Sequence, residues 1–85
     1  MKINLNDYTW EEAKDLADLD PVILLPLGAF EQHGKHLPLK VDEFMVNKIA
    51  IESVSKSHDK NITAVVAPVI WTGYSPHHMD FAGTI

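Results

Sequence analysis

The sequence predicts an α/β fold built on a parallel strand–helix–strand unit, and three observations support this prediction. Two apolar runs, "VILLPL" at 22–27 and "ITAVVAPVI" at 62–70, are continuous rather than alternating, which is typical of strands buried on both faces of a parallel sheet. Residues 42–57 between them carry an apolar stripe at helical spacing. A helix that joins two strands favours a right-handed crossover and a parallel pair.

A further helix is expected before the first strand, over residues 8–19. Thr9 followed by Glu12 is a capping-box pattern, in which the side chain of each residue accepts a hydrogen bond from the backbone N–H of the other. Pro21 then ends the helix, because the residue before a proline disfavours helical backbone. The order of elements is therefore helix, strand, loop, helix, strand and loop, which fits one small domain.

Composition excludes several functional classes. The formal net charge is −5, with 7 Lys and Arg against 12 Asp and Glu, which argues against binding nucleic acid or anionic lipid. There are no cysteines, so a metal ion would have to be held by His, Asp and Glu. The N-terminus lacks the apolar core of a signal peptide, and the apolar runs are far shorter than the ~20 residues that span a bilayer. We expect a soluble, cytoplasmic protein.

The chemically active side chains gather in the two loops that follow the strands. Glu31, His33 and His36 follow the first strand, and His77, His78 and Asp80 follow the second. Ligands of open α/β sheets bind beyond the carboxyl ends of the strands. If the strands are parallel, both loops lie at the same edge of the sheet and converge on one site.

The stretch "EQH" favours a metal site. Glu31 and His33 are two residues apart, so on an extended segment both side chains point the same way. Asp42 could supply a third ligand, and such an oxygen and nitrogen set suits Zn²⁺, Mn²⁺ or Fe²⁺. Asp42 also stands where a helix N-cap belongs, and that interpretation is equally open. Glu43 is expected to be a first-turn carboxylate favoured by the helix dipole.

Other residues have ordinary structural interpretations. His36 could be an exposed loop histidine, and His58 reads as a solvated turn residue with no role. Of the adjacent pair His77 and His78, one structural and one functional role is expected, since neighbouring side chains point in different directions. The aromatic residues of the second loop could line a substrate pocket or close the end of the core: Trp71, Tyr74 and Phe81.

Two long motifs together resemble the creatininase family. The stretch "LPLGAFEQHGKHLPLKVDEF" is similar to the family pattern P-x-G-x-x-E-Q-H-G-x-H-L-P-L-x-x-D, and "GYSPHHMDFAGT" to G-x-S-x-x-H-x-x-F-P-G-T. The resemblance covers roughly residues 20–85. Ala82 stands where the family has proline, which would change the stiffness of a turn rather than the chemistry.

The resemblance implies a metal-dependent amidohydrolase on a layered α/β fold, which hydrolyses a non-peptide C–N bond through a metal-activated hydroxide. It implies two zinc or manganese ions in the complete enzyme, with iron possible, and assembly as a homohexamer. Glu31 would bind one ion and His33 the other, and Asp42 would bridge them. His36 and His78 would lie near the ions as catalytic groups. The substrate could be a lactam, a formamide or a modified peptide.

The resemblance also implies that residues 1–85 are the N-terminal third of a single creatininase-type domain, whose layered sheet is incomplete in this chain. In the family, a further His and Glu from an N-G-H-x-E-like segment downstream complete the metal shells, and this sequence does not contain it. We therefore expect the chain alone to be inactive as a hydrolase. The alternatives are a non-catalytic module that binds metal or complements a partner subunit, and a fragment with no function of its own.

Overall fold

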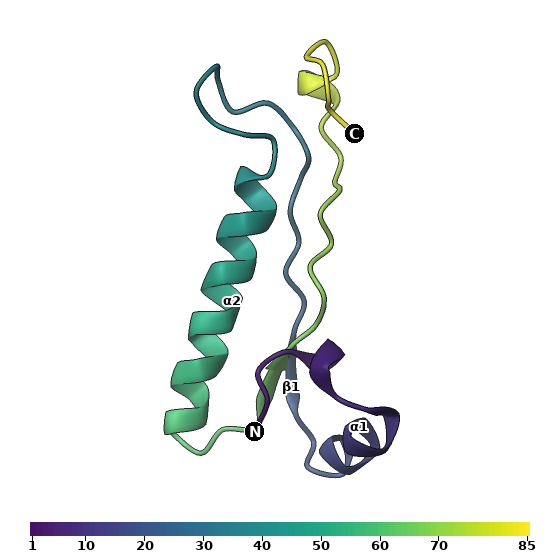
Figure 1. The fold of residues 1–85 in the computed structure, drawn as a ribbon, viewed down its shortest axis with the longest axis vertical. Coiled ribbons are helices and arrows are strands. Elements are labelled where there is room, and N and C mark those ends of the chain that lie inside the picture. The colour runs from purple at the N-terminus through teal and green to yellow at the C-terminus, as the bar shows by residue number, and fades with distance from the viewer.

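The computed structural model describes residues 1–85 and confirms the predicted α/β class (Figure 1). Its elements are the 3-10 helix η1 (Leu5–Asp7), α1 (Trp10–Ala17), β1 (Val22–Leu24), α2 (Val41–Asp59), β2 (Ala64–Val66) and the 3-10 helix η2 (Pro76–His78). β1 and β2 pair in parallel, with Val22 opposite Ala64 and Leu24 opposite Val66. α2 forms the crossover between them, as a parallel pair requires.

The two strands are shorter than predicted, but their pairing continues toward the loops. The Gly28 N–H donates to the Ile70 carbonyl at 2.8 Å, and the Ile70 N–H donates to the Pro26 carbonyl at 3.0 Å. A further parallel bridge joins Leu27 to Ile70. The segments that leave β1 and β2 therefore run side by side (Figure 1) and deliver both loops to one end of the molecule.

The core lies between α2 and β2. On the edge of β2 that β1 does not occupy, Asn4 bridges to Val66 in parallel, so β2 is the central strand. All three β2 residues are buried, and Val65 is 0% exposed. The core cluster consists of Ala50, Val54, Ala64 and Val66.

The prediction that the first strand is buried on both faces is wrong for this chain. Val22 and Ile23 of β1 are 55% and 53% exposed. β1 is the edge strand of the pair, and α2 packs on β2 instead. A continuous apolar run indicates a strand that needs cover on both faces, and the described residues cover only β2.

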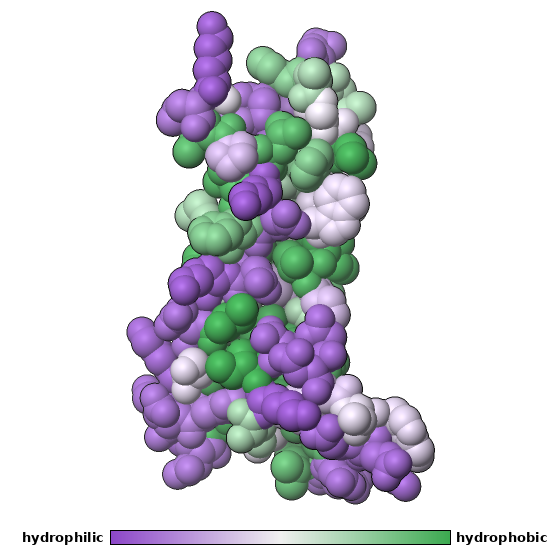
Figure 2. All heavy atoms as spheres, viewed as in Figure 1, coloured by the Kyte–Doolittle hydropathy of each residue, from purple (hydrophilic) through white to green (hydrophobic).

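The apolar stripe of α2 is also only partly covered. α2 buries Ala50 and Val54, whereas Phe44, Met45 and Ile49 stay more than half exposed. The molecule is elongated, at 46 × 24 × 17 Å, with a radius of gyration of 15.7 Å. A compact chain of this length has a radius of gyration of about 12 Å. Hydrophobic patches accordingly show on the surface (Figure 2).

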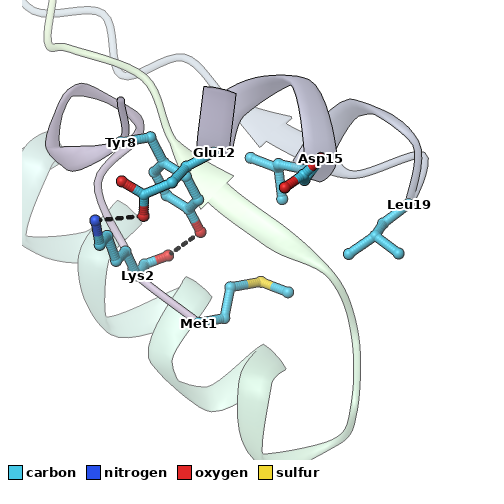
Figure 3. Close-up of a pocket in the computed structure, with 7 residues that line it drawn as sticks. Met1, Lys2, Tyr8, Glu12, Asp15 and Leu19 are labelled. Atoms are coloured by element: carbon cyan, nitrogen blue, oxygen red, sulfur yellow. Dashed lines mark hydrogen bonds and ion pairs between the residues drawn. The ribbon is translucent and has the colours of Figure 1, made fainter. Parts of the chain in front are cut away.

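The N-terminal region closes the end opposite the loops. α1 begins at the predicted capping box, because the Glu12 N–H donates to Thr9 Oγ1 and the Thr9 N–H donates to Glu12 Oε1, both at 3.2 Å. Lys2 Nζ contacts Glu12 Oε2 at 2.7 Å, and the Tyr8 hydroxyl donates to the Lys2 carbonyl at 3.0 Å (Figure 3). These side chains line the largest surface hollow, of about 610 Å³, far from the predicted site. No helix has the length and apolar character to cross a membrane.

Candidate metal centre

The two loops that follow the strands converge, as the parallel topology predicted. The Ile85 N–H donates to the Phe30 carbonyl at 3.1 Å, which ties the C-terminal loop to the segment after β1. The rings of Phe30 and Trp71 pack edge to face, with centroids 5.2 Å apart. Gly73 approaches so closely that a Cβ there would lie 2.9 Å from the Gly28 carbonyl oxygen. Residues more than forty positions apart in sequence are thereby brought together.

Glu31, His33 and Asp42 form one candidate ligand set. One potential ligand atom from each lies within 4.8 Å of the others. The first two side chains come from the extended segment after β1, and Asp42 comes from the first turn of α2. His33 Nε2 and Asp42 Oδ1 are 3.3 Å apart. The three side chains are only 14–33% exposed, so the set is largely shielded from solvent but still accessible to it.

His33 carries the atom that most needs a partner. Its Nε2 is buried and makes no hydrogen bond. A buried polar atom without a partner costs roughly 1–3 kcal/mol, so this arrangement is unfavourable unless something binds there. Two atoms bound to one tetrahedral zinc at about 2.1 Å lie about 3.4 Å apart, close to the separation of His33 Nε2 from Asp42 Oδ1. The residues therefore fit a divalent cation.

Asp42 is not the N-cap of α2, so that interpretation is wrong. The N-cap is Lys40, whose side chain makes no capping hydrogen bond. Asp42 is the second residue of the helix, where a carboxylate is favoured by the dipole, and Glu43 follows it in the same turn. A Cβ on Gly28 would lie 3.1 Å from the Glu43 backbone, so glycine allows the loop to pass directly over this first turn.

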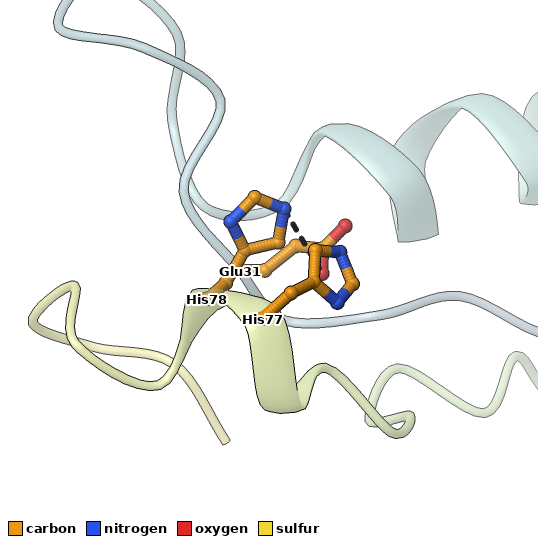
Figure 4. Close-up of side chains that lie close together, drawn as sticks. All are labelled: Glu31, His77 and His78. Atoms are coloured by element: carbon orange, nitrogen blue, oxygen red, sulfur yellow. Dashed lines mark ion pairs between the residues drawn. The ribbon is translucent and has the colours of Figure 1, made fainter.

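A second group of candidate ligands shares Glu31. His77 and His78 of η2 lie close to the Glu31 carboxylate, and one ligand atom from each of the three falls within 4.8 Å of the others (Figure 4). The two imidazole rings are 4.1 Å apart at their centroids. His78 Nε2 is 3.9 Å from Glu31 Oε2, a longer separation than that between His33 and Asp42.

The environment of Glu31 stabilises its ionised form. The pKa of Glu31 is lowered from its usual value of 4.5, chiefly by a hydrogen bond from the Ser75 side chain. Partial desolvation opposes this shift, and positive charge on His78, His77 and His33 adds to it. Ser75 is buried, at 4% exposed. Glu31 is therefore a carboxylate at neutral pH, the form in which it can bind a cation.

Gln32 links the two loops. The Gly34 N–H donates to Gln32 Oε1 at 2.8 Å, and Gln32 Nε2 lies 3.2 Å from His78 Nδ1. The His78 backbone is held as well, because Thr84 Oγ1 donates to its carbonyl at 2.7 Å. The Phe81 ring packs edge to face against the imidazole at 5.9 Å.

The remaining histidines and aromatic residues lie elsewhere. His36 is exposed and belongs to neither candidate set, so its predicted catalytic role stays a prediction. The interpretation of His58 as a solvated turn residue is wrong. It lies in the last turn of α2, half-buried, and its Nε2 is 2.8 Å from the Ala64 carbonyl, where it joins the helix to β2. Tyr74 is 89% exposed and lines no pocket.

Gln32 and Ser75 do not stand out from the sequence as functional residues. Both lie inside the two motifs, in "EQHG" and "GYSP", but neither residue type is a common ligand of metal ions. Their importance depends on which side chains they face across the two loops. These contacts are determined by how the segments that follow β1 and β2 pair with each other.

Comparison with known proteins agrees with the fold and the motifs. A family model described as creatininase, creatinine amidohydrolase, matches residues 6–85. The chain is 36% identical over 78 residues to a mycofactocin precursor peptide peptidase of Mycobacterium tuberculosis, which covers 86% of this chain and 31% of that protein. It is 35% identical over 65 residues to a 3-dehydro-scyllo-inosose hydrolase of Thermotoga maritima, covering 75% of this chain and 19% of that protein.

A creatinine amidohydrolase of Pseudomonas putida is 32% identical over 80 residues, covering 93% of this chain and 29% of that protein. Among solved structures, a manganese creatininase superposes with a TM-score of 0.84 at 28% identity, over 100% of this chain and 34% of that one. A mutant creatininase of the Zn–Zn type gives a TM-score of 0.83 at 29% identity, with the same coverage.

Fold, motifs and comparisons define an α/β protein of a hydrolase family. The chain belongs to the creatininase family. It spans between about a fifth and a third of the length of the relatives and structures that it matches.

Proposed function

We propose that this chain is part of a metal-dependent amidohydrolase that hydrolyses a non-peptide C–N bond, in a cyclic amide or a formamide. The names of the three relatives agree on hydrolysis and differ in the substrate. Two similar creatininase structures are described as manganese and Zn–Zn forms, which supports zinc or manganese as the ion. The ligands that we propose are Glu31, His33 and Asp42.

The observation that carries this proposal is the buried Nε2 of His33. It has no hydrogen-bond partner and lies 3.3 Å from Asp42 Oδ1, the spacing expected of two ligands on one ion. Its other neighbour is Glu31, which its surroundings keep ionised. A cation would satisfy the nitrogen and neutralise both carboxylates at once.

Each ligand has a separate proposed role. In the complete enzyme, Glu31 would hold one ion, His33 would hold the other, and Asp42 would contribute to both. When bound, such ions lower the pKa of a water molecule and polarise the amide carbonyl. We propose that His78, whose Nε2 lies 3.9 Å from Glu31 Oε2, acts beside the ions and that His36 faces the substrate.

We further propose that residues 1–85 correspond to the first third of one creatininase domain, and that hydrolysis requires the remaining ligands. The match to about 31% of the length of a relative supports this proposal, and so do the uncovered faces of β1 and α2. The pure chain should then bind metal weakly and should not hydrolyse amides. Hydrolysis by the pure chain that is lost in Glu31→Gln would overturn this part of the proposal.

Calorimetric titration of the metal-free chain with Zn²⁺ and with Mn²⁺ tests the ligand set. His33→Ala should weaken binding at least tenfold, since losing an outer partner of a metal ligand alone costs about 10–100-fold. His36→Ala is the matched control, because it removes an exposed histidine three residues away and should leave the affinity unchanged. Asp42→Asn and Glu43→Gln, made as separate variants, give the same comparison for carboxylates. Asp42→Asn should weaken metal binding, and Glu43→Gln is its control. Equal losses within a pair would contradict the proposal.

A non-catalytic module is the second candidate function, and the exposed apolar side chains of β1 and α2 favour it. In this case the chain would bind metal and would form a stoichiometric complex with a polypeptide that supplies the rest of the domain. Mixing the two and measuring both complex size and amide hydrolysis separates the candidates. A complex that forms without hydrolysis would favour the module.

A further inference from the structure

The side chain of Gln32 contacts the imidazole ring of His78. An amide offers an oxygen acceptor on one side and an NH2 donor on the other. The Gly34 N–H, which can only donate, lies 2.8 Å from Gln32 Oε1 and therefore fixes which way the amide points. The NH2 group is left facing His78 Nδ1 at 3.2 Å.

The local backbone supports this orientation of the amide. Gly34 has a φ of +79°, in the left-handed region that side chains other than glycine rarely adopt. This conformation turns the chain directly after Gly34, whose own N–H bonds to the side chain two residues earlier. The Gln-x-Gly segment therefore acts as one unit that presents an N–H donor to the second loop.

The NH2 group that faces Nδ1 of His78 determines which ring nitrogen carries the imidazole proton. Neutral histidine carries one proton, so the nitrogen that accepts a hydrogen bond has none and the other nitrogen carries it. His78 Nδ1 accepts from Gln32, which leaves the proton on Nε2. That nitrogen is directed toward the Glu31 carboxylate, 3.9 Å away (Figure 4).

We propose that Gln32 is a positioning residue that holds His78 as the Nε2–H tautomer, so that His78 directs an N–H toward Glu31 and does not bind a metal ion. This inference rests on the proposed function, because it assigns different roles to the histidines that lie near Glu31. His33 Nε2 is buried without a hydrogen-bond partner and belongs to the proposed metal set. His78 offers a proton.

The same contact excludes the ligand group formed by Glu31, His77 and His78 as a metal site through His78 Nε2. A histidine that binds metal through Nε2 keeps its proton on Nδ1 and donates it to an acceptor. Here Nδ1 faces an NH2 group, so metal binding would set two N–H donors against each other. Only the set of Glu31, His33 and Asp42 remains without such a conflict.

Long-range proton–nitrogen correlation spectra of the metal-free chain, with ¹⁵N-labelled histidine, read the tautomers directly. His78 is assigned from the signal that disappears in His78→Asn. The same spectrum contains two references. His58 Nε2 lies 2.8 Å from the Ala64 carbonyl and must carry a proton there, and exposed His36 makes no hydrogen bond and reports the free mixture.

In the spectrum of the unmodified chain, we expect His78 to show the same pattern as His58, with the proton on Nε2. In Gln32→Glu, a carboxylate replaces the NH2 donor, so a proton should appear on Nδ1 of His78 while His58 is unchanged. An unchanged His58 signal also shows that the variant is folded. If Gln32→Glu does not fold, Gln32→Met should move His78 toward the pattern of His36.

A Zn²⁺ titration of the same sample separates this inference from the proposed function. We expect the Nε2 signal of His33 to move on binding while His78 keeps its proton on Nε2. If no signal moves, the metal proposal fails, but the tautomer result stands on the metal-free spectra. A His78 proton on Nδ1 in the unmodified chain, a His78 tautomer that no Gln32 variant alters, or zinc bound at His78 Nε2 would each overturn the inference.

Discussion

Val54→Ala tests whether the stabilising core of the chain lies between α2 and β2. Val54 is fully buried and belongs to the cluster with Ala64 and Val66. The substitution removes two methyl-sized groups, each contributing ~0.8 kcal/mol by burial. It leaves a cavity of roughly 50 Å³, which adds about 1.2 kcal/mol at ~24 cal/mol per Å³. We expect the free energy of unfolding to fall by about 2–3 kcal/mol.

That loss is a large part of the total stability. A chain of this length has a free energy of unfolding of roughly 4–13 kcal/mol. Urea unfolding followed by circular dichroism should show the midpoint falling by about 1–2 M. Because metal binding would stabilise the folded state, the measurement is made with a chelator present.

Ile49→Ala in the same helix is the matched control. It removes more atoms than Val54→Ala does, but Ile49 is 61% exposed, so the stability should change by less than ~0.5 kcal/mol. Equal midpoint shifts for the two variants would refute the reasoning, because they would place the core elsewhere on α2. If further polypeptide covers this face, Ile49→Ala should become the costlier substitution once that polypeptide is bound.

Three further predictions concern α1 and the approach of the loops. Thr9→Ala removes the capping hydrogen bond to the Glu12 N–H and should cost about 1 kcal/mol in urea unfolding, whereas Thr9→Ser should cost little. The pKa of Glu12 is lowered from 4.5, first by its contact with Lys2, so its stabilising contribution is present above that value and is lost as the pH falls through the lower folded value. Glu12→Gln should therefore flatten the acid dependence of unfolding below pH 4.5, and an unchanged profile would contradict this. Gly73→Ala places a Cβ 2.9 Å from the Gly28 carbonyl and should weaken Zn²⁺ binding at least about tenfold, as measured by calorimetry, since small displacements at a site are costly.

Local patterns in the sequence predicted what depends on local physics. The capping box at Thr9 formed as expected, and the parallel pairing followed from a helix lying between two apolar runs. The convergence of the two loops then followed from topology alone. The two-residue period of an extended segment likewise predicted that Glu31 and His33 point the same way, and both belong to one candidate ligand set.

Burial could not be predicted in this way, because it depends on what lies against each face. The run at 22–27 is apolar enough for a strand covered on both sides, yet Val22 and Ile23 are exposed. Phe44 and Ile49 follow the helical period and are exposed too. The sequence thus predicts which surfaces are apolar enough to be buried, while the structure shows which of them the described residues bury.

The roles of individual polar groups depend on contacts between the loops. Asp42 is equally compatible in sequence with a cap and with a ligand, and only the position of His33 Nε2 beside it favours the ligand. The glutamine of "EQH" resembles a spacer between two ligands. Its amide lies between the Gly34 N–H and the His78 ring, so it leaves Nδ1 of His78 as an acceptor and the proton on Nε2. A neutral side chain that is no candidate metal ligand therefore determines the chemistry of a histidine 46 positions away in the sequence.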